Sequence, residues 1–333
     1  MSNMIEVEGL TKTFSSSTKV VAGVSFSVNE GDIFSLLGPN GAGKTTTIRM
    51  LTTLVSITAG RALVGSYDVS KDPGSVRNLI GVVPQEVTLD NELKGMENLQ
   101  LAAKLHHVPK AVADERAREL LRLVDLSESM NNRASTYSGG MKRRLQLVTA
   151  LIHEPRILFL DEPTVGLDIQ TRTRIWDYIR QLNRERGLTI FMTTHYLEEA
   201  DQLSDVVAIM DHGAIKVSGP PRELKDSLQG DVLTISVEDG GEDLAGFLRS
   251  IPNVSEVTRA DHSYRLKLPR VESALPEIIT EVALKGFRIA ETSFSKPSLD
   301  QVFLEVTGRS MRDTEEGGGA HDGHASVHAR ETR

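Results

Sequence analysis

Apolar residues gather in short unbroken runs along the first part of the chain. Four such runs cover residues 33–37, 157–160, 189–192 and 206–210. Unbroken runs are typical of strands that are buried on both faces, so they predict a mostly parallel sheet. Helical spacing of apolar residues lies between the runs, at 111–124 and at 172–186, where Gly187 supplies a helix stop. Alternating strands and helices predict an α/β domain.

The beginning and the end of the chain show other patterns. Within residues 4–28 apolar and polar positions alternate, which predicts antiparallel strands. A break at Gly219-Pro220-Pro221 is followed by a short helix over 222–228. Beyond it we expect strands at 232–237, 254–259, 264–268 and 287–292, helices at 242–250 and 271–285, and a last helix at 298–306. The order β-α-β-β-α-β is that of a small α+β ferredoxin-like domain.

These patterns divide the chain into three parts. We expect a first domain over residues 1–228, a second over 229–308 and a tail over 309–333. The tail has no apolar periodicity, so we predict that it is disordered. Its His321, His324 and His328 could bind a metal, although the sequence favours a solvated tail.

Composition excludes several classes of protein. The net charge of −8 argues mildly against a nucleic-acid-binding protein, which usually carries a basic face. Cysteine is absent from the sequence, which excludes disulfides and cysteine-based zinc sites. No apolar stretch reaches the roughly 18 residues that a membrane-spanning helix needs. We therefore expect a soluble chain that reaches a membrane only through a partner.

A glycine-rich segment follows the first buried run. Residues Gly38-Pro39-Asn40-Gly41-Ala42-Gly43-Lys44-Thr45 fit the pattern G-x-x-x-x-G-K-[ST] between a predicted strand and a helix-like segment. Glycines let the backbone curl so that its N–H groups point at phosphate oxygens, and a helix N-terminus favours anions. Lys44 would place a cation against the β- and γ-phosphates, and the Thr45 hydroxyl can bind Mg²⁺. The segment predicts a nucleotide site.

Two further segments carry matching chemistry. The run at 157–160 ends in Asp161 and Glu162, which places two carboxylates at the strand end where α/β folds bind ligands. Because successive side chains at a strand end point differently, Asp161 fits a metal role and Glu162 the role of general base. Ser138-Gly139-Gly140 precedes another helical pattern and predicts a helix N-terminus with open amides, a second anion site.

Together these segments resemble the nucleotide-binding domain of ABC transporters, a fold with a mostly parallel sheet, an antiparallel N-terminal subdomain and a helical subdomain. In that family Ser-Gly-Gly binds the γ-phosphate of the ATP held by the opposite subunit. Here Tyr137 and Met141 flank Ser138-Gly139-Gly140 where the common form has Leu and Gln. The ending 298–308 and the stretch 193–201 are similar to the daunorubicin-resistance subgroup, which comprises drug exporters.

The resemblance implies roles for further residues. Gln85 would contact Mg²⁺ and water, His195 would touch the γ-phosphate, and the phosphate-binding set would extend to Thr46. Asp168 would communicate across a dimer, although a lone Asp there would more often be a helix N-cap. Phe14 sits where the family places an aromatic ring against adenine, with a core Phe as the alternative.

The resemblance also implies a function. We expect an ATPase, an ABC-type translocase, that uses ATP and Mg²⁺ and works as an ATP-dependent homodimer or with a paralogous ATPase. It would lie on the cytoplasmic face of the cell membrane, against a separately encoded transmembrane permease. The permease would dock on the segment that runs from Gln85 past Leu93, Met96 and Leu99 to His107. Together the two proteins would export a drug-like or lipid-like substrate. The alternatives are an importer ATPase and a soluble ABC ATPase without a transport role.

Overall fold

The computed structural model describes residues 2–14, 19–228, 230–238, 242–260, 263–269 and 271–311. The chain forms two compact units, Met1–Pro221 together with the chain from Arg309, and Arg222–Gly308. From residue 312 the expected tail lies outside the described residues, and so do His321, His324 and His328. Among the described residues no helix combines the length and the hydropathy that crossing a membrane requires.

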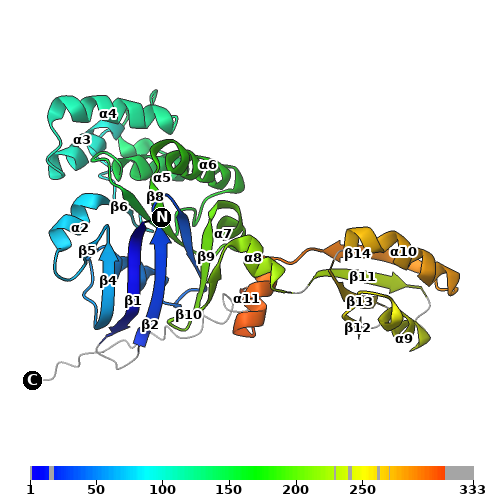
Figure 1. Ribbon diagram of the computed structural model, residues 1–333. Helices are drawn as coiled ribbons and strands as arrows, with labels where there is room; N and C mark the ends of the chain where they lie inside the picture. The colour runs from blue at the N-terminus through cyan, green and yellow to red at the C-terminus, as the bar shows by residue number, and fades with distance from the viewer. Residues whose placement is uncertain are drawn as a thin grey trace, which may run out of the picture. The chain divides into compact units, whose positions relative to one another are not determined.

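A six-stranded sheet forms the centre of the first unit (Figure 1). Its order is β10-β9-β3-β8-β7-β6, and all neighbours are parallel except β9 and β10. The strands are β3 (Ile33–Leu37), β6 (Ile80–Val83), β7 (Ile157–Asp161), β8 (Thr189–Thr194), β9 (Val206–Asp211) and β10 (Ala214–Gly219). The four apolar runs of the sequence are β3, β7, β8 and β9, which confirms the parallel α/β fold.

Both faces of this sheet are covered, which explains why the middle of its central strands is mostly apolar. In β8, Ile190 and Met192 belong to one core cluster, whereas Phe191 belongs to the other. Phe191 stacks on Phe34 of β3 with ring centroids 5.3 Å apart. Alternate residues in the middle of one strand thus enter two separate cores, whereas the polar Thr189, Thr193 and Thr194 stand at its two ends.

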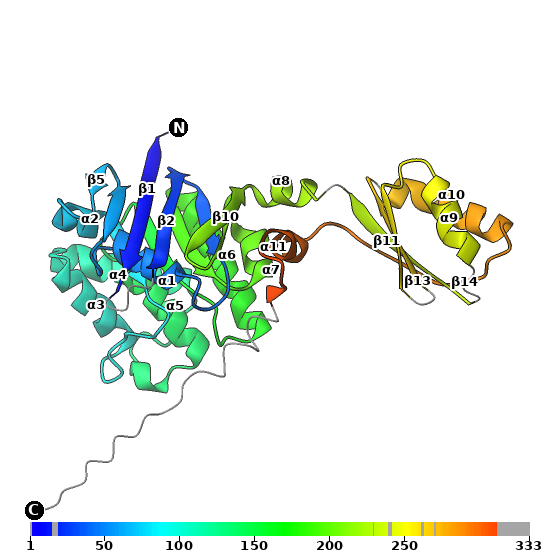
Figure 2. The same ribbon diagram turned by 90° about the horizontal axis from the view of Figure 1, so that it is seen from below.

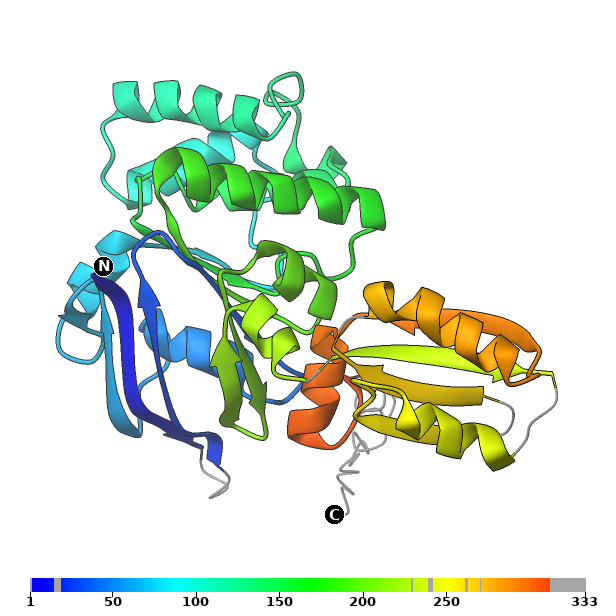
Figure 3. The same cartoon turned by 45° about the vertical axis from the view of Figure 1, so that its right-hand side comes forward.

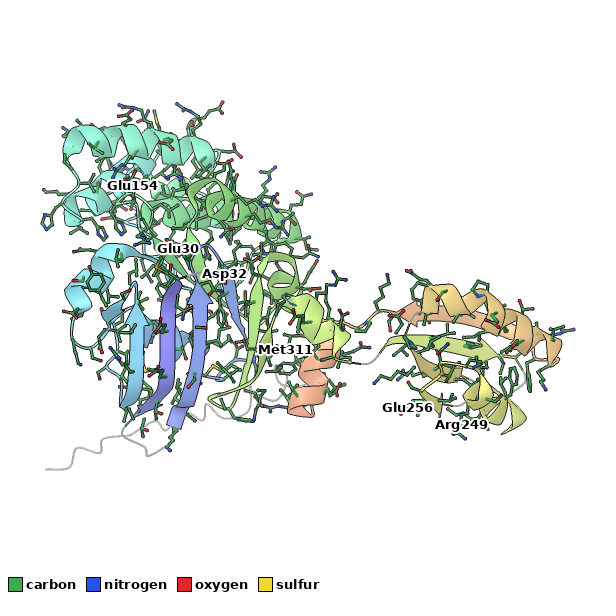
Figure 4. The ribbon with its side chains drawn as sticks, in the orientation of Figure 1. Glu30, Asp32, Glu154, Arg249, Glu256 and Met311 are labelled. Atoms are coloured by element: carbon green, nitrogen blue, oxygen red, sulfur yellow. The ribbon has the colours of Figure 1, made fainter. Side chains whose placement is uncertain are left out.

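Helices cover the first face. The helix α5 (Gly139–Thr149) and the long α6 (Ile169–Arg186) lie over the sheet, with α3 (Gly95–Leu105) and α4 (Lys110–Leu123) beyond them (Figure 3). The predicted stop at Gly187 is confirmed, since this residue adopts the left-handed conformation with φ 61°. Surface ion pairs lie near the edge of this layer: Arg116 of α4 pairs with Glu154, and Arg156 pairs with Glu30; both glutamates are labelled in Figure 4.

A second, antiparallel sheet lies on the other face, with the order β2-β1-β4-β5. Its strands are β1 (Asn3–Thr13), β2 (Lys19–Asn29), β4 (Ala59–Val64) and β5 (Tyr67–Asp68), and α1 (Lys44–Leu51), α2 (Pro73–Leu79) and α7 (Leu197–Leu203) complete the unit. Ile5, Val7 and Leu10 of β1 point into the shared core. The alternation at the start of the chain therefore marks antiparallel strands, as predicted.

The second unit is the expected ferredoxin-like domain. Its elements are β11 (Asp231–Val237), α9 (Glu242–Ser250), β12 (Glu256–Ala260), β13 (Ser263–Leu268), α10 (Val271–Leu284) and β14 (Ile289–Ser295), flanked by α8 (Pro221–Asp226) and α11 (Leu299–Thr307). The antiparallel sheet has the order β12-β13-β11-β14. Both α9 and α10 lie on one side of it (Figure 2), over the alternate residues Leu233, Ile235 and Val237 of β11.

Candidate functional site

The glycine-rich segment forms a loop between β3 and α1. Gly38 passes so close to β9 that a Cβ there would lie 2.1 Å from the carbonyl oxygen of Met210, so no other residue fits. Gly43 caps α1 with φ 104°, a conformation that side chains other than glycine rarely adopt. The loop is thereby held against the sheet, and the N-terminus of α1 opens beside it. A helix N-terminus of this kind presents unpaired N–H groups to an anion.

Lys44 is the first residue of α1, and its side chain folds back over the loop. Its Nζ donates to the carbonyl oxygens of Gly38 at 2.8 Å and Pro39 at 3.0 Å. It also lies 3.3 Å from Oε1 of Glu162, and both side chains are almost completely buried. The loop therefore surrounds one fixed cation, which suits a polyanionic ligand.

Asp161 and Thr45 bring two oxygens together at the end of β7. The Thr45 hydroxyl donates to Oδ1 of Asp161 at 3.1 Å, and the Thr193 hydroxyl donates to the same oxygen at 2.6 Å. Thr193 belongs to the neighbouring strand β8, so the sheet itself orients the carboxylate. Hydroxyl and carboxylate oxygens are ligands that Mg²⁺ prefers, and the donor set fits this ion.

Glu162 is the first residue beyond β7, and its backbone turns sharply. Its φ of 47° lies in the left-handed region, where a residue other than glycine costs about 1–3 kcal/mol. Two acceptors on Thr193, the carbonyl and the hydroxyl oxygen, each bind the Glu162 N–H at 3.1 Å. This turn directs the carboxylate away from the strand axis and towards Lys44 and His195.

The charge of Glu162 is set by its neighbours. Burial alone raises the pKa of its carboxyl, but the hydrogen bond from His195 and the ammonium of Lys44 outweigh burial, so the pKa lies below its usual value. His195 Nδ1 is 3.2 Å from Oε2 of Glu162. Glu162 is therefore an anion at neutral pH, ready to accept a proton.

A cavity of about 390 Å³ joins these groups, within the size range of ligand sites. Its lining residues are Val20, Asn40, Gly41, Gly43, Lys44, Thr45, Thr46, Gln85 and Glu162. Gln85 reaches this cavity from the loop after β6, on the other side of β7 from β8. Ala42 is different, because its side chain is buried in the core and only its backbone belongs to the loop. The cavity thus brings much of the glycine-rich loop together with Gln85 and Glu162.

The remaining predicted residues do not line this cavity. Phe14 is 47% exposed at the end of β1, with Lys12 Nζ 5.0 Å from its ring centroid. Ser138 is the N-cap of α5 and accepts from the backbone of Met141. Asp168 is the N-cap of α6, where its carboxylate accepts both the backbone N–H and the hydroxyl of Thr171.

The unusual Tyr137 has a clear structural role. Its side chain is buried, and its hydroxyl donates to the carbonyl oxygen of Ser129 at 2.6 Å. A Cβ on Gly95, at the start of α3, would lie 2.3 Å from that hydroxyl. The bulk of Tyr137 is thus accommodated by a glycine on α3, and Tyr137 ties the loop before α5 to the helical layer.

Sequence reasoning missed two buried polar residues beside the site. Arg143 of α5 is 5% exposed and donates to carbonyl oxygens around Gln85 and Glu162. Glu199 of α7 accepts from the Thr164 hydroxyl and from Trp176 Nε1, and burial raises the pKa of its carboxyl. Arg143 stands in the run Lys142-Arg143-Arg144, typical of a solvated face. Its spacing from Leu147 and Gln146, on the buried side of α5, was the available signal.

Comparisons with known proteins agree with this geometry. Residues 21–165 match the family model of ABC transporters, and residues 219–307 match the C-terminal domain of DrrA1-3-like ATP-binding proteins. The chain is 36% identical to the linearmycin resistance ATP-binding protein LnrL of Bacillus subtilis (strain 168), over 93% of this chain and 100% of LnrL. The chain belongs to the ATP-binding proteins of ABC transporters.

Other members of the family extend the comparison. The ABC protein described here is 38% identical to the daunorubicin resistance ATP-binding protein DrrA3 of Streptomyces coeruleorubidus, over 92% of this chain and 97% of DrrA3. The structure titled as the dimeric structure of MJ0796, a bacterial ABC transporter cassette, has a TM-score of 0.60 and 25% identity, and the match covers 65% of this chain and 98% of that one. The ABC domain thus binds ATP, its family hydrolyses ATP, and such cassettes work as dimers with transmembrane permeases.

Proposed function

We propose that this protein hydrolyses ATP to drive the export of a drug-like or lipid-like compound through a separately encoded permease, on the cytoplasmic face of the cell membrane. The observation that carries the hydrolytic part is the contact of Glu162 with both Lys44 and His195 at the edge of one cavity. The export part is supported by the relatives, whose names describe resistance to linearmycin and daunorubicin.

In this proposal each residue has a separate task. The glycine-rich loop between β3 and α1, called the phosphate loop below, holds the β- and γ-phosphates together with Lys44. Glu162 accepts a proton from the attacking water. The low pKa of Glu162 keeps it in the basic form at neutral pH. His195, whose Nδ1 is 3.2 Å from Oε2 of the same carboxylate, would fix its orientation and would contact the γ-phosphate. A positioned general base contributes about 10²–10⁴-fold to the rate.

Thr45, Asp161 and Gln85 would hold Mg²⁺. Thr45 and Asp161 already share a hydrogen bond, and Gln85 lines the same cavity. The ion would neutralise charge that develops on the phosphate oxygens. Because Thr193 and Thr45 both donate to Oδ1 of Asp161, the chain holds this oxygen in one orientation.

We propose that a second copy, or a paralogous ATPase, completes each site. Ser138, Gly139 and Asp168 are exposed and do not line the cavity of their own chain. The neighbouring Ile169 is 79% exposed, an apolar side chain that a partner would cover. In a head-to-tail pair, these residues would face the ATP held by Lys44 of the other subunit. Whether Phe14 stacks on adenine stays a prediction.

The permease would dock on a groove beside α3. This cavity of about 420 Å³ has a mostly apolar wall that includes Leu54, Leu101 and Leu105, which are 68%, 43% and 71% exposed. The groove lies in the segment expected for docking, but Leu99 is completely buried and cannot contact a partner. An exposed apolar groove of this kind fits the end of a helix from a membrane protein.

The deciding experiment is purification of the full chain from detergent-solubilised membranes of its own host. We expect a permease with six membrane-spanning helices to co-purify, and vesicles that contain both proteins to move a drug-like compound only with hydrolysable ATP. Transport of the compound towards the side that carries the ATPase would contradict export. Co-purification with ribosomes instead of a membrane protein would contradict a transport role.

A further inference from the structure

Arg143 connects three segments that surround the candidate site. It lies on α5, is almost completely buried, and uses all three guanidinium nitrogens as donors. Its acceptors are the carbonyl oxygens of Pro84 at 2.6 Å, Gln85 at 3.4 Å, Asp161 at 3.2 Å, Glu162 at 3.1 Å and Pro163 at 2.6 Å. One side chain therefore fixes the loop after β6 and the turn after β7 together.

A second side chain on the same helix supports this contact. Gln146 lies one turn further along α5 and accepts from Arg143 at 2.8 Å. Its amide nitrogen donates to the carbonyl oxygen of Glu86 at 2.8 Å, in the same loop as Gln85. Arg143 is thus itself held in one orientation, and the Gln85 loop is fixed at two points.

The residue type matters for this geometry. A guanidinium is a planar fork with donors in fixed directions, so it can serve two loops at once, whereas a lysine concentrates its donors at one point. One of the acceptors is the carbonyl of Glu162, whose backbone adopts the strained φ of 47°. Strained turns persist only where their surroundings hold them. Thr193 accepts from the backbone N–H of Glu162 and Arg143 donates to its carbonyl oxygen, so the residue is held on both sides of its Cα.

The guanidinium remains charged although it is buried. Burial lowers the pKa of Arg143 to about 10, while Glu199 and Asp161 oppose that change, so the side chain is a cation at neutral pH. Hydrogen bonds from a charged donor are stronger than neutral ones. Losing Arg143 would remove a charged donor from five carbonyl oxygens at once.

We propose that Arg143 is a positioning residue that sets the Glu162 carboxylate and the Gln85 side chain in one geometry and thereby controls the rate of hydrolysis without binding nucleotide itself. It does not line the cavity. The helix that carries it begins at Ser138, so Arg143 also joins the segment expected to face the other subunit's ATP to the general base of its own chain. This inference rests on the proposed ATPase function.

The test compares Arg143→Met and Arg143→Lys with the parent in the full chain. We expect Arg143→Met to lower kcat about 10²-fold, since a misplacement near 1 Å costs about that much. KM for ATP and the Kd of a fluorescent ATP analogue should change less than about 3-fold, because the phosphate loop is untouched. Arg143→Lys should recover part of kcat. A parental kcat in folded Arg143→Met, or a Kd that weakens in parallel with kcat, would overturn the proposal.

A matched control and a second variant separate positioning from folding. Arg144 is the next residue on α5, but it donates to the carbonyl oxygen of Val124, away from the cavity, so Arg144→Met should keep kcat. If Arg143→Met does not fold, Gln146→Met removes the second anchor and should lower kcat less, in the same direction. An unchanged kcat in folded Gln146→Met would then count against the proposal.

Hydrogen exchange measures how firmly the two loops are held, independently of the rate of hydrolysis. Backbone amides of the 84–88 and 162–166 segments should exchange faster in Arg143→Met than in the parent, and those of the phosphate loop should not. Equal exchange in both segments would overturn the inference. If the parent protein hydrolyses no ATP, either alone or with its permease, the proposed function is wrong. If the parent hydrolyses ATP and Arg143→Met does so at the same rate, only the proposed role of Arg143 is wrong.

Discussion

Lys44 and Glu162, from distant parts of the sequence, meet with Nζ 3.3 Å from Oε1. The Lys44 ammonium holds the Glu162 carboxylate beside the glycine-rich loop. This contact, together with the hydrogen bond from His195, lowers the pKa of the Glu162 carboxyl. A buried pair of this kind is costly to break from one side, because the other charge stays buried. The contact therefore makes Glu162 the first residue to test.

Glu162→Gln removes the base but keeps the shape of the side chain. We expect kcat for ATP hydrolysis to fall by about 10²–10⁴-fold, while the Kd for ATP stays within about 3-fold of the parent. Steady-state phosphate release and equilibrium binding of a fluorescent analogue measure the two effects. Glu198→Gln, at an exposed position of α7, is the matched control and should leave both kcat and the Kd for ATP unchanged. Parental turnover by Glu162→Gln would remove Glu162 from the mechanism.

Alanine substitutions at the adjacent Gly139 and Gly140 test assembly and folding separately. A Cβ on Gly140 would lie 2.6 Å from Cγ2 of Thr171, whereas a Cβ on Gly139 would have no atom within 4 Å in its own chain. We expect Gly140→Ala to lower the free energy of unfolding by about 1–3 kcal/mol. Gly139→Ala should leave Tm unchanged but slow hydrolysis, because the methyl group would stand where the other subunit's ATP binds. Parental hydrolysis by Gly139→Ala would contradict the shared site.

The docking groove can be tested at its exposed leucines. Leu101→Glu and Leu105→Glu place a charge in the apolar wall beside α3. We expect each change to lower permease-coupled transport at least about 10-fold, because burying an unpaired carboxylate is costly, while ATP binding and Tm stay unchanged. Leu284→Glu is the control: Leu284 is 82% exposed in the second unit. Equal transport by all three variants would place the permease elsewhere.

Because the ring of His153 is partly buried, we expect the stability of the fold to depend on pH. Its ring stacks on His106 with centroids 3.7 Å apart, and its Nε2 lies 2.9 Å from the carbonyl oxygen of Ile80. Burial, followed by the repulsion of His106, lowers the pKa of His153 from 6.5 to about 4. Above pH 6.5 neither the folded nor the unfolded state binds this proton. Between pH 6.5 and 4 only the unfolded state does, so the folded state loses stability as the pH falls.

His153→Gln removes this proton uptake. We expect Tm of the parent to fall more steeply between pH 7 and pH 5 than Tm of His153→Gln, as measured by thermal denaturation in matched buffers. The exposed His212 is the control, and His212→Gln should follow the parent. Parallel curves for the parent and His153→Gln would show that His153 does not titrate in the way its burial implies.

Local pattern was sufficient for much of the fold. Unbroken apolar runs identified β3, β7, β8 and β9, because the central residues of strands covered on both faces are mostly apolar. The expected strand at 232–237 corresponds to β11, but β14 runs from Ile289 to Ser295, beyond the expected 287–292. Its pairing with β11, from Val237 opposite Ile289 to Val232 opposite Ser295, decides these ends. The sequence around one strand does not show which other strand it pairs with, so it does not fix where the strand ends.

At the candidate site, the motifs alone were enough to select the chemical groups and give their order along the chain. Lys44, Thr45, Asp161 and Glu162 were identified because phosphate binding and metal binding demand particular residues at particular spacings. Their contacts depended on the sheet, which brings β3, β7 and β8 side by side. Only the tertiary structure distinguished Arg143, buried among carbonyl oxygens, from Arg144 beside it, because burial of a charged side chain depends on which segments fold over it and not on its neighbours in sequence.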